Sequence, residues 1–292
     1  MHGPLGVPRR EPVLPARQIP GASAGGGDYI SEYRAEAHTC VEARFGMADP
    51  ICYLGDDDLG GAAAYLAGVM LHTGLAFEHV PSTEPAPPDL AARRWSAFVV
   101  SDYPAARFGR EAMASVAQAV REGAGLLMVG GWESFHGRLG EYPGTPLAEA
   151  LPVDMLSCDD RRNFAQPCLV RPLADHPVLE GIAWEMPPGI GGLNAFRPRP
   201  QTQTVLAAVP FVVRLEDGRF SFYPQEELPL LVLGRFGRGR TAALATDVAP
   251  HWVGGLVDWG DQRILQPVGN GFVEIGNRYA RLLANLLRWI IG

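Results

Sequence analysis

The chain has 292 residues, of which 47% are hydrophobic and 20% charged, a balance typical of a globular protein with a sizeable core. Its formal net charge of −7 excludes a broadly basic surface, so we expect neither nucleic acid nor an anionic membrane as a partner. All 25 basic residues are Arg, and the lack of Lys excludes Schiff-base lysines, phosphate-loop lysines and lysine-borne cofactors. We expect no cofactor and a small molecule or a protein as the partner.

The four cysteines predict neither a metal centre nor a disulfide framework. Their spacing fits no CxxC motif and no dense set of disulfides, so we expect them to be reduced. The sequence shows neither a signal-peptide pattern nor an apolar run long enough to cross a membrane. Together these features predict a cytoplasmic protein.

Residues 1–47 predict a flexible or docking extension. Five prolines lie in the first 20 residues and three consecutive glycines follow at 25–27, a composition that buries too little apolar surface to order itself alone. Tyr29–Tyr33 is the segment best suited to dock the extension on another surface. We expect residues 48–292 to form a single domain.

From Pro50 onward, strand and helix patterns alternate. We predict helices at 60–73 and 110–121, and strands at 51–54, 75–80, 96–100 and 125–129. Repeated strand–helix units predict an α/β fold, with a parallel sheet covered by helices on both faces.

After Leu151 the alternating strand and helix pattern gives way to short predicted strands between Pro-rich and Gly-rich connections. We predict a β-rich insertion over 151–228, with strands at 168–172, 204–209, 211–215 and 220–223. A hairpin-like pair at 230–235 and 240–246 follows. Apolar residues then recur at helical spacing from 277 to 291, which predicts a last helix that packs on the sheet.

Ligands of open α/β sheets bind beyond the carboxyl ends of the strands. The candidate ligand-binding residues follow these predicted strand ends: Asp56, Asp57, Asp58, Asp102, Tyr103, Gly131, Trp132, Glu133, Ser134, Asp247, His251 and Trp252. The carboxylates there could orient hydroxyl groups or hold a hard divalent cation, although we assign no metal to them. The alternative is loop solvation and helix capping, for which Asp58 is well placed as an N-cap.

The catalytic candidates are Asp102, Ser134 and His251. Ser134 beside His136 or His251 could imitate a serine hydrolase, but its spacing does not fit a nucleophile elbow, which favours a structural hydroxyl bonded to a loop amide. His251 is a base, a ligand or a packed ring. Four aromatic residues either line a pocket or pack in the core: Trp132, Phe135, Trp252 and Trp259.

Several sequence blocks in combination resemble the putative glutamine amidotransferase-like family, a branch of the class I glutamine amidotransferase-like superfamily. They are YLGDDD (53–58), SDYP (101–104), GGWESFHGRLGEYPGTPLAEALPVDML (130–156), HPVLEGI (176–182) and GRTAALATDVAPHW (239–252). The resemblance spans most of the chain after residue 50. It implies a flavodoxin-like sheet.

Active members of that superfamily are expected to use a Cys at a strand-end elbow and a later His-x-Glu pair, with the cysteine forming a thioester from glutamine. Here Gly130–Ser134 takes the place of the elbow without a Cys, and the late strand ends in Asp247–His251 without His-x-Glu. The resemblance therefore implies the fold without its catalytic triad. We predict a protein that binds or transforms a small polar metabolite, and related sugar-utilisation branches favour a carbohydrate.

Two alternatives remain open at this level. The first is a non-catalytic oligomeric scaffold or regulatory partner, in which residues 1–47 drape over a neighbouring subunit. The second is a glutamine amidotransferase with an unrecognised nucleophile. An enzyme of this kind would be a divergent hydrolase or transferase, and we expect a homo-oligomer.

Overall fold

Five parallel strands form the centre of the structure. The computed structural model describes residues 49–90 and 92–292, so the predicted extension over 1–47 lies outside the described residues. Side by side, with every neighbouring pair parallel, the central strands are β2 (Phe77–Val80), β1 (Ile51–Gly55), β3 (Ala97–Ser101), β4 (Gly125–Val129) and β13 (Gly239–Leu244). Every residue of β1, β3 and β4 is buried, as expected for strands covered on both faces.

Four antiparallel strands continue the same sheet beyond β13. In order they are β12 (Leu228–Phe236), β9 (Gln203–Val209), β6 (Arg161–Pro172) and β7 (Gly189–Asn194). The predicted α/β fold is confirmed, and the β-rich region extends the main sheet because the β12–β13 hairpin returns the chain along its open edge. A tight turn makes that hairpin, with Gly237 at φ +61°. Strand β6 begins at Arg161, earlier than predicted.

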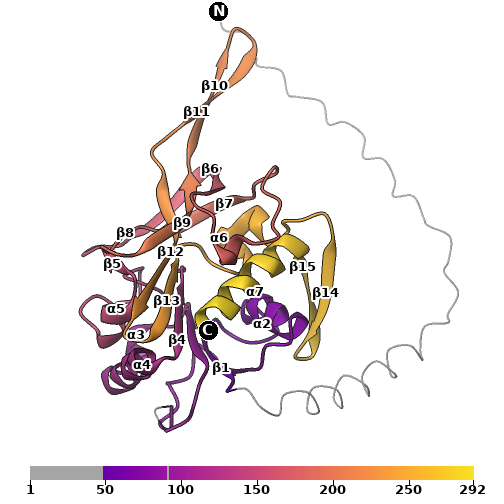
Figure 1. Ribbon diagram of the computed structural model, residues 1–292. Helices are drawn as coiled ribbons and strands as arrows, with labels where there is room; N and C mark the ends of the chain where they lie inside the picture. The colour runs from indigo at the N-terminus through magenta and orange to yellow at the C-terminus, as the bar shows by residue number, and fades with distance from the viewer. Residues whose placement is uncertain (1–48, 91) are drawn as a thin grey trace, which may run out of the picture. The chain divides into compact units, whose positions relative to one another are not determined.

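Helices cover both faces of the sheet (Figure 1). One face carries α2 (Ala63–His72) and α7 (Asn277–Ile291), and the other carries α3 (Ala105–Phe108), α4 (Arg110–Glu122) and α5 (Pro146–Ala150). Helix α7 spans the predicted residues. Its apolar stripe is buried against the sheet through Tyr279, Leu282, Leu283, Leu286, Leu287 and Ile290.

Three two-stranded sheets and three short helices complete the described chain. The small sheets pair β5 (Val153–Met155) with β8 (Phe196–Pro198), β10 (Phe211–Glu216) with β11 (Arg219–Pro224), and β14 (Arg263–Val268) with β15 (Gly271–Gly276). The short helices are α6 (Pro250–Val253) and the 3₁₀ turns η1 (Pro177–Leu179) and η2 (Gly254–Leu256). The sequence pattern missed β14–β15, which packs on α2. Among the described residues, no helix combines the length and apolarity needed to span a membrane.

Candidate functional site

Acidic side chains meet at the carboxyl ends of the central strands. Strands β1, β3 and β13 all run in the same direction, so Asp56, Asp102 and Asp247, which follow them, lie at one edge of the sheet. The charge of Asp247 acts on Asp56, on Asp102 and on His251. We call these four residues the strand-end cluster.

Asp56 is a buried carboxyl group that directly follows β1. Its backbone has a positive φ of 56°, and the phenol of Tyr53 donates a hydrogen bond to its Oδ2. Burial, followed by the charge of Asp247, raises the pKa of Asp56 to about 7, although the Tyr53 hydrogen bond opposes the rise. At neutral pH this group therefore exchanges between a carboxylic acid and a carboxylate.

Asp102 lies at a strained turn from strand to helix. Its φ is +43°, between the end of β3 and the start of α3, and non-glycine residues with positive φ often mark functional sites. Its Oδ1 accepts a 2.8 Å hydrogen bond from the backbone N–H of Glu133. Burial, followed by the charge of Asp247, raises the pKa of Asp102 well above its usual value, and the Glu133 N–H opposes the rise.

A helix follows β3 within a few residues, whereas no helix follows β4 until α5 begins at Pro146. The segment Gly130–Ser134, expected to take the place of the elbow, is therefore a loop and not a strand-to-helix turn. The intervening loop instead closes over Asp102. The hydroxyl of Ser134 is buried and accepts a 3.0 Å hydrogen bond from the Asp102 backbone N–H, which is the structural role weighed for it above.

Asp247 connects the buried part of the cluster to solvent through His251. Oδ1 of Asp247 accepts a 2.9 Å hydrogen bond from the backbone N–H of Ala249, and Oδ2 lies 3.4 Å from Nδ1 of His251. The His251 side chain is 70% exposed, whereas that of Asp247 is 3% exposed. Its hydrogen bond with Asp247 raises the pKa of His251, with burial opposing. The pair is therefore suited to exchange a proton with a bound molecule.

A buried polar network that the sequence analysis missed holds the loop after β4. Oδ1 of Asn194 accepts from the backbone N–H of Gly131 at 2.8 Å, while its Nδ2 donates to the Gly131 carbonyl at 3.1 Å and to Asp160 Oδ1 at 2.8 Å. Asp160 also accepts from the backbone N–H groups of His136 and Gly137. These residues come from β7 and the start of β6, and no local pattern indicates that those strands reach this edge.

Most of the predicted aromatic lining packs in the core. Phe135, Trp252 and Trp259 are buried, which agrees with the core-packing alternative for these three rings. Tyr103 is also buried, with its hydroxyl bonded to the Glu84 carbonyl, so its side chain is unavailable to a ligand. Trp132 is the exception, because its side chain is 47% exposed. The guanidinium of Arg161 stacks over the Trp132 ring at 4.5 Å.

Asp57 and Asp58 are exposed and bond the turn between β1 and α2. Oδ1 of Asp57 accepts from the backbone N–H groups of Asp58 and Ala62, at 2.7 and 2.9 Å. Asp58 bonds the N–H of Gly60 at 2.6 Å, while the N-cap of α2 is Ala62. The N-cap prediction for Asp58 is therefore wrong, because a turn over 59–62 separates it from the helix.

The buried cysteines are poor nucleophiles. Cys52 lies inside β1, where burial raises the pKa of its thiol to about 12. Cys168 lies inside β6, where burial raises its pKa to about 11. Cys158 is exposed in the loop before β6. Across residues 49–90 and 92–292, no group of three or more His, Cys, Asp or Glu side chains has the arrangement of a metal site.

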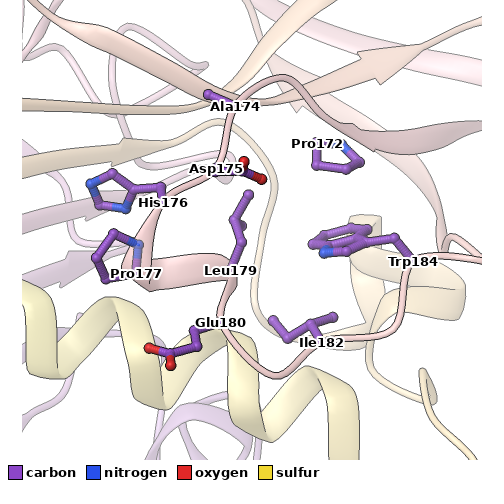
Figure 2. Close-up of a pocket in the computed structure, with 9 residues that line it drawn as sticks. All are labelled: Pro172, Ala174, Asp175, His176, Pro177, Leu179, Glu180, Ile182 and Trp184. Atoms are coloured by element: carbon purple, nitrogen blue, oxygen red, sulfur yellow. The ribbon is translucent and has the colours of Figure 1, made fainter.

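A separate pocket lies at the amino ends of the parallel strands, and Figure 2 shows the side chains that line it. Its volume is about 540 Å³, and it is lined by Pro172, Ala174, Asp175, His176, Pro177, Leu179, Glu180, Ile182 and Trp184. Strand β6 runs antiparallel to β13 through β9 and β12, so its end at Pro172 lies at the amino ends of the parallel strands. This pocket is therefore not part of the strand-end cluster.

Comparisons with known proteins agree with this architecture. The cytoplasmic protein STM3548 from Salmonella typhimurium superposes with a TM-score of 0.64 at 24% identity, over 82% of this chain and 98% of that chain. The cytoplasmic protein STM1381 from Salmonella typhimurium LT2 gives the same TM-score and identity, over 82% and 99% of the two chains. Likeness at this level shows a shared fold. No curated protein sequence matches the chain.

The sequence profile of one family also matches the chain, over residues 103–266. The match begins directly after Asp102 and contains Asp247 and His251, and it covers more than half of the 292 residues. The chain therefore belongs to the putative glutamine amidotransferase family, GATase1-like.

Proposed function

We propose that this protein binds a small hydroxyl-rich metabolite, such as a carbohydrate or another polyol, at the strand-end cluster. The observation that carries the proposal is the position of Asp102 at the strained turn between β3 and α3. In α/β enzymes a turn of this kind holds the nucleophile, and here it holds a carboxyl group. A carboxyl group at that position favours hydrogen bonding and proton transfer over thioester chemistry.

The titration behaviour of the cluster supports a hydroxyl-rich ligand. A protonated carboxyl group both donates and accepts hydrogen bonds, as a sugar hydroxyl does, and burial raises the pKa values of Asp56 and Asp102 in this direction. The half-exposed ring of Trp132, over which the Arg161 guanidinium stacks, adds an aromatic surface of the kind that stacks on sugars. If the ligand is transformed, the His251–Asp247 pair accepts the proton of a bound hydroxyl group.

The two buried cysteines, Cys52 and Cys168, argue against thioester chemistry. A nucleophilic cysteine needs a lowered pKa, because the thiolate is the reactive form. Burial raises the pKa values of both Cys52 and Cys168, and each lies within a strand. We therefore propose that the protein does not release ammonia from glutamine.

The test is a thermal-shift panel of sugars, sugar acids and linear polyols on the full chain. A ligand at about 100 times its dissociation constant stabilises a protein by about 2.7 kcal/mol. We expect a response in the wild type that Asp102→Asn abolishes, because this change keeps the shape of the side chain but removes its acid. Asp217→Asn, an exposed aspartate in the turn between β10 and β11, is the matched control and should respond as the wild type does.

Three outcomes would contradict the proposal. A response that survives Asp102→Asn would place the ligand elsewhere, and the pocket of Figure 2 would be the first alternative. Ammonia release from glutamine that a Cys→Ser variant abolishes would establish an amidotransferase. If no polyol shifts the melting temperature of the wild type, and Asp102→Asn melts at the same temperature as the wild type, a non-catalytic scaffold would be favoured.

A cytoplasmic location is part of the proposal, since the two Salmonella proteins of similar fold are described as cytoplasmic.

A further inference from the structure

One hairpin of the described chain has a completely apolar face. In β10–β11, residues directly opposite each other in the antiparallel pair point to the same side. One side carries Phe211, Val213, Leu215, Phe220, Phe222 and Pro224, which we call the apolar hairpin face. The rings of Phe211 and Phe222 lie 5.8 Å apart on it. The face carries no polar side chain.

The other side of the same hairpin is polar and makes its own contacts. The guanidinium of Arg214 lies 5.1 Å from the ring of Tyr223, and the Tyr223 hydroxyl bonds Glu216 at 2.7 Å. The hairpin is therefore amphipathic, like a strand pair that packs on a core. Arg214, Glu216 and Tyr223 contact one another on the polar side, whereas the side chains of the apolar hairpin face need another surface.

No other part of residues 49–90 and 92–292 covers the outer end of the apolar hairpin face. Leu215, Phe220 and Phe222 are 66%, 70% and 64% exposed. Figure 1 shows why: the hairpin leaves the sheet after β9 and extends away from it, so the helices do not cover it. An isolated two-stranded hairpin is only marginally stable in water, and a third strand or a covering layer is needed to hold it.

We propose that the apolar hairpin face is an interface with a second copy of this chain. An aromatic side chain buries about 150–250 Å², so this face offers roughly 500 Å² per copy and about 1,000 Å² for two copies. That area is close to the smallest expected for a specific interface. A two-fold contact uses the same patch on both subunits, and two hairpins packed face to face form a four-stranded sandwich. The second copy thus supplies the covering layer that each hairpin lacks.

The test is the mass of the full chain in solution, measured by sedimentation. We expect twice the 31.5 kDa of one chain for the wild type. The triple variant Leu215→Thr, Phe220→Thr, Phe222→Thr should halve that mass, because threonine keeps the strand preference but removes the apolar surface. Far-UV circular dichroism of the variant should match the wild type and show that the sheet is intact.

The matched control lies on the other exposed hairpin. Leu265 and Phe272 on β14–β15 are 65% and 69% exposed, nearly the same as Leu215 and Phe220. Leu265→Thr with Phe272→Thr should leave the mass unchanged. A monomeric wild type, a triple variant that keeps the wild-type mass, or dissociation by the control pair would overturn the proposal.

Hydrogen exchange keeps the proposal testable if the triple variant does not fold. In the wild type, the amides of residues 211–224 should exchange more slowly as the protein concentration rises, because dimers protect the hairpin. The amides of β14–β15 should show no such dependence. Fast exchange over 211–224 at every concentration would show that a second copy does not cover this face, and a different partner would then be the occupant.

Discussion

Oδ1 of Asp102 accepts a 2.8 Å hydrogen bond from the backbone N–H of Glu133 across the loop after β4. This contact needs a glycine beside it, because a Cβ atom on Gly131 would lie 1.9 Å from the same oxygen. The positive φ at Asp102 and the lack of a side chain at Gly131 are therefore both needed to place the carboxyl group against the loop. The loop brings the carboxyl group and its hydrogen-bond donor together.

Gly131→Ala should displace the Asp102 carboxyl group. We expect a loss of the ligand response and a fall of about 1–3 kcal/mol in the free energy of unfolding, because overpacking forces side chains or backbone to shift. Gly271→Ala is the control, since a Cβ there meets nothing within 4 Å. Urea unfolding measures both variants. Equal stability of Gly131→Ala and the wild type would show that the loop relaxes freely.

Asn194→Ala should destabilise the fold more than a typical surface change. The substitution removes the partner of the Gly131 N–H and one donor to Asp160, so buried polar groups lose their hydrogen bonds. Each such loss costs about 1–3 kcal/mol, and we expect a total of about 2–4 kcal/mol in urea unfolding. Asn285→Ala on α7, whose amide also bonds two carbonyls but is less buried, is the control and should cost less. A smaller effect for Asn194→Ala than for Asn285→Ala would contradict this account.

Stability should depend on pH through Asp56. Burial raises the pKa of Asp56 from 3.8 to about 7, so the folded state binds this proton more tightly than the unfolded state. The stabilisation is complete below pH 3.8 and is lost as the pH rises through about 7. Asp56→Asn should therefore be more stable than the wild type at about pH 8, by about 1–4 kcal/mol, with a smaller difference at about pH 5.

The neighbouring Asp57 provides the control for that experiment. Desolvation raises its pKa, but hydrogen bonds from the backbone N–H groups of Asp58 and Ala62 outweigh it and lower the pKa overall. Its stabilisation is therefore present above its unfolded pKa and lost as the pH falls. Asp57→Asn should give no gain at about pH 8. A gain equal to that of Asp56→Asn would mean that net charge, not burial, sets the effect.

His251 should titrate above its usual value of 6.5, because of its hydrogen bond with Asp247. Because the pKa of His251 is higher in the folded state than in the unfolded state, protonated His251 stabilises the fold. This stabilisation is complete below pH 6.5 and is lost as the pH rises through the pKa of the folded state. We expect a small contribution to stability, because the side chain is mostly exposed. Proton NMR of the imidazole measures the pKa directly. Asp247→Asn should lower it, and an unchanged pKa would show that the pair is not coupled.

The sequence by itself determined the fold class and the edge of the sheet where the cluster lies. Buried apolar strands, helical spacing and strand-end aspartates are local patterns, so the parallel order of strands places Asp56 and Asp102 together without further information. The predicted helix over 277–291 coincides with α7 for the same reason. The hairpin β14–β15 was missed because its turn, Gly269–Asn270, lies between strands that each alternate weakly.

Only the tertiary structure decided which side chains reach the site. Asn194 and Asp160 join it because β7 and β6 pair with distant strands, and long-range antiparallel register is not written in any local window. The turn from strand to helix follows β3 at Asp102 and not β4, because Asn194 and Asp160 hold the chain after β4 as a loop. Burial likewise set the pKa of Asp56, since the same carboxyl group in water would be fully ionised at neutral pH.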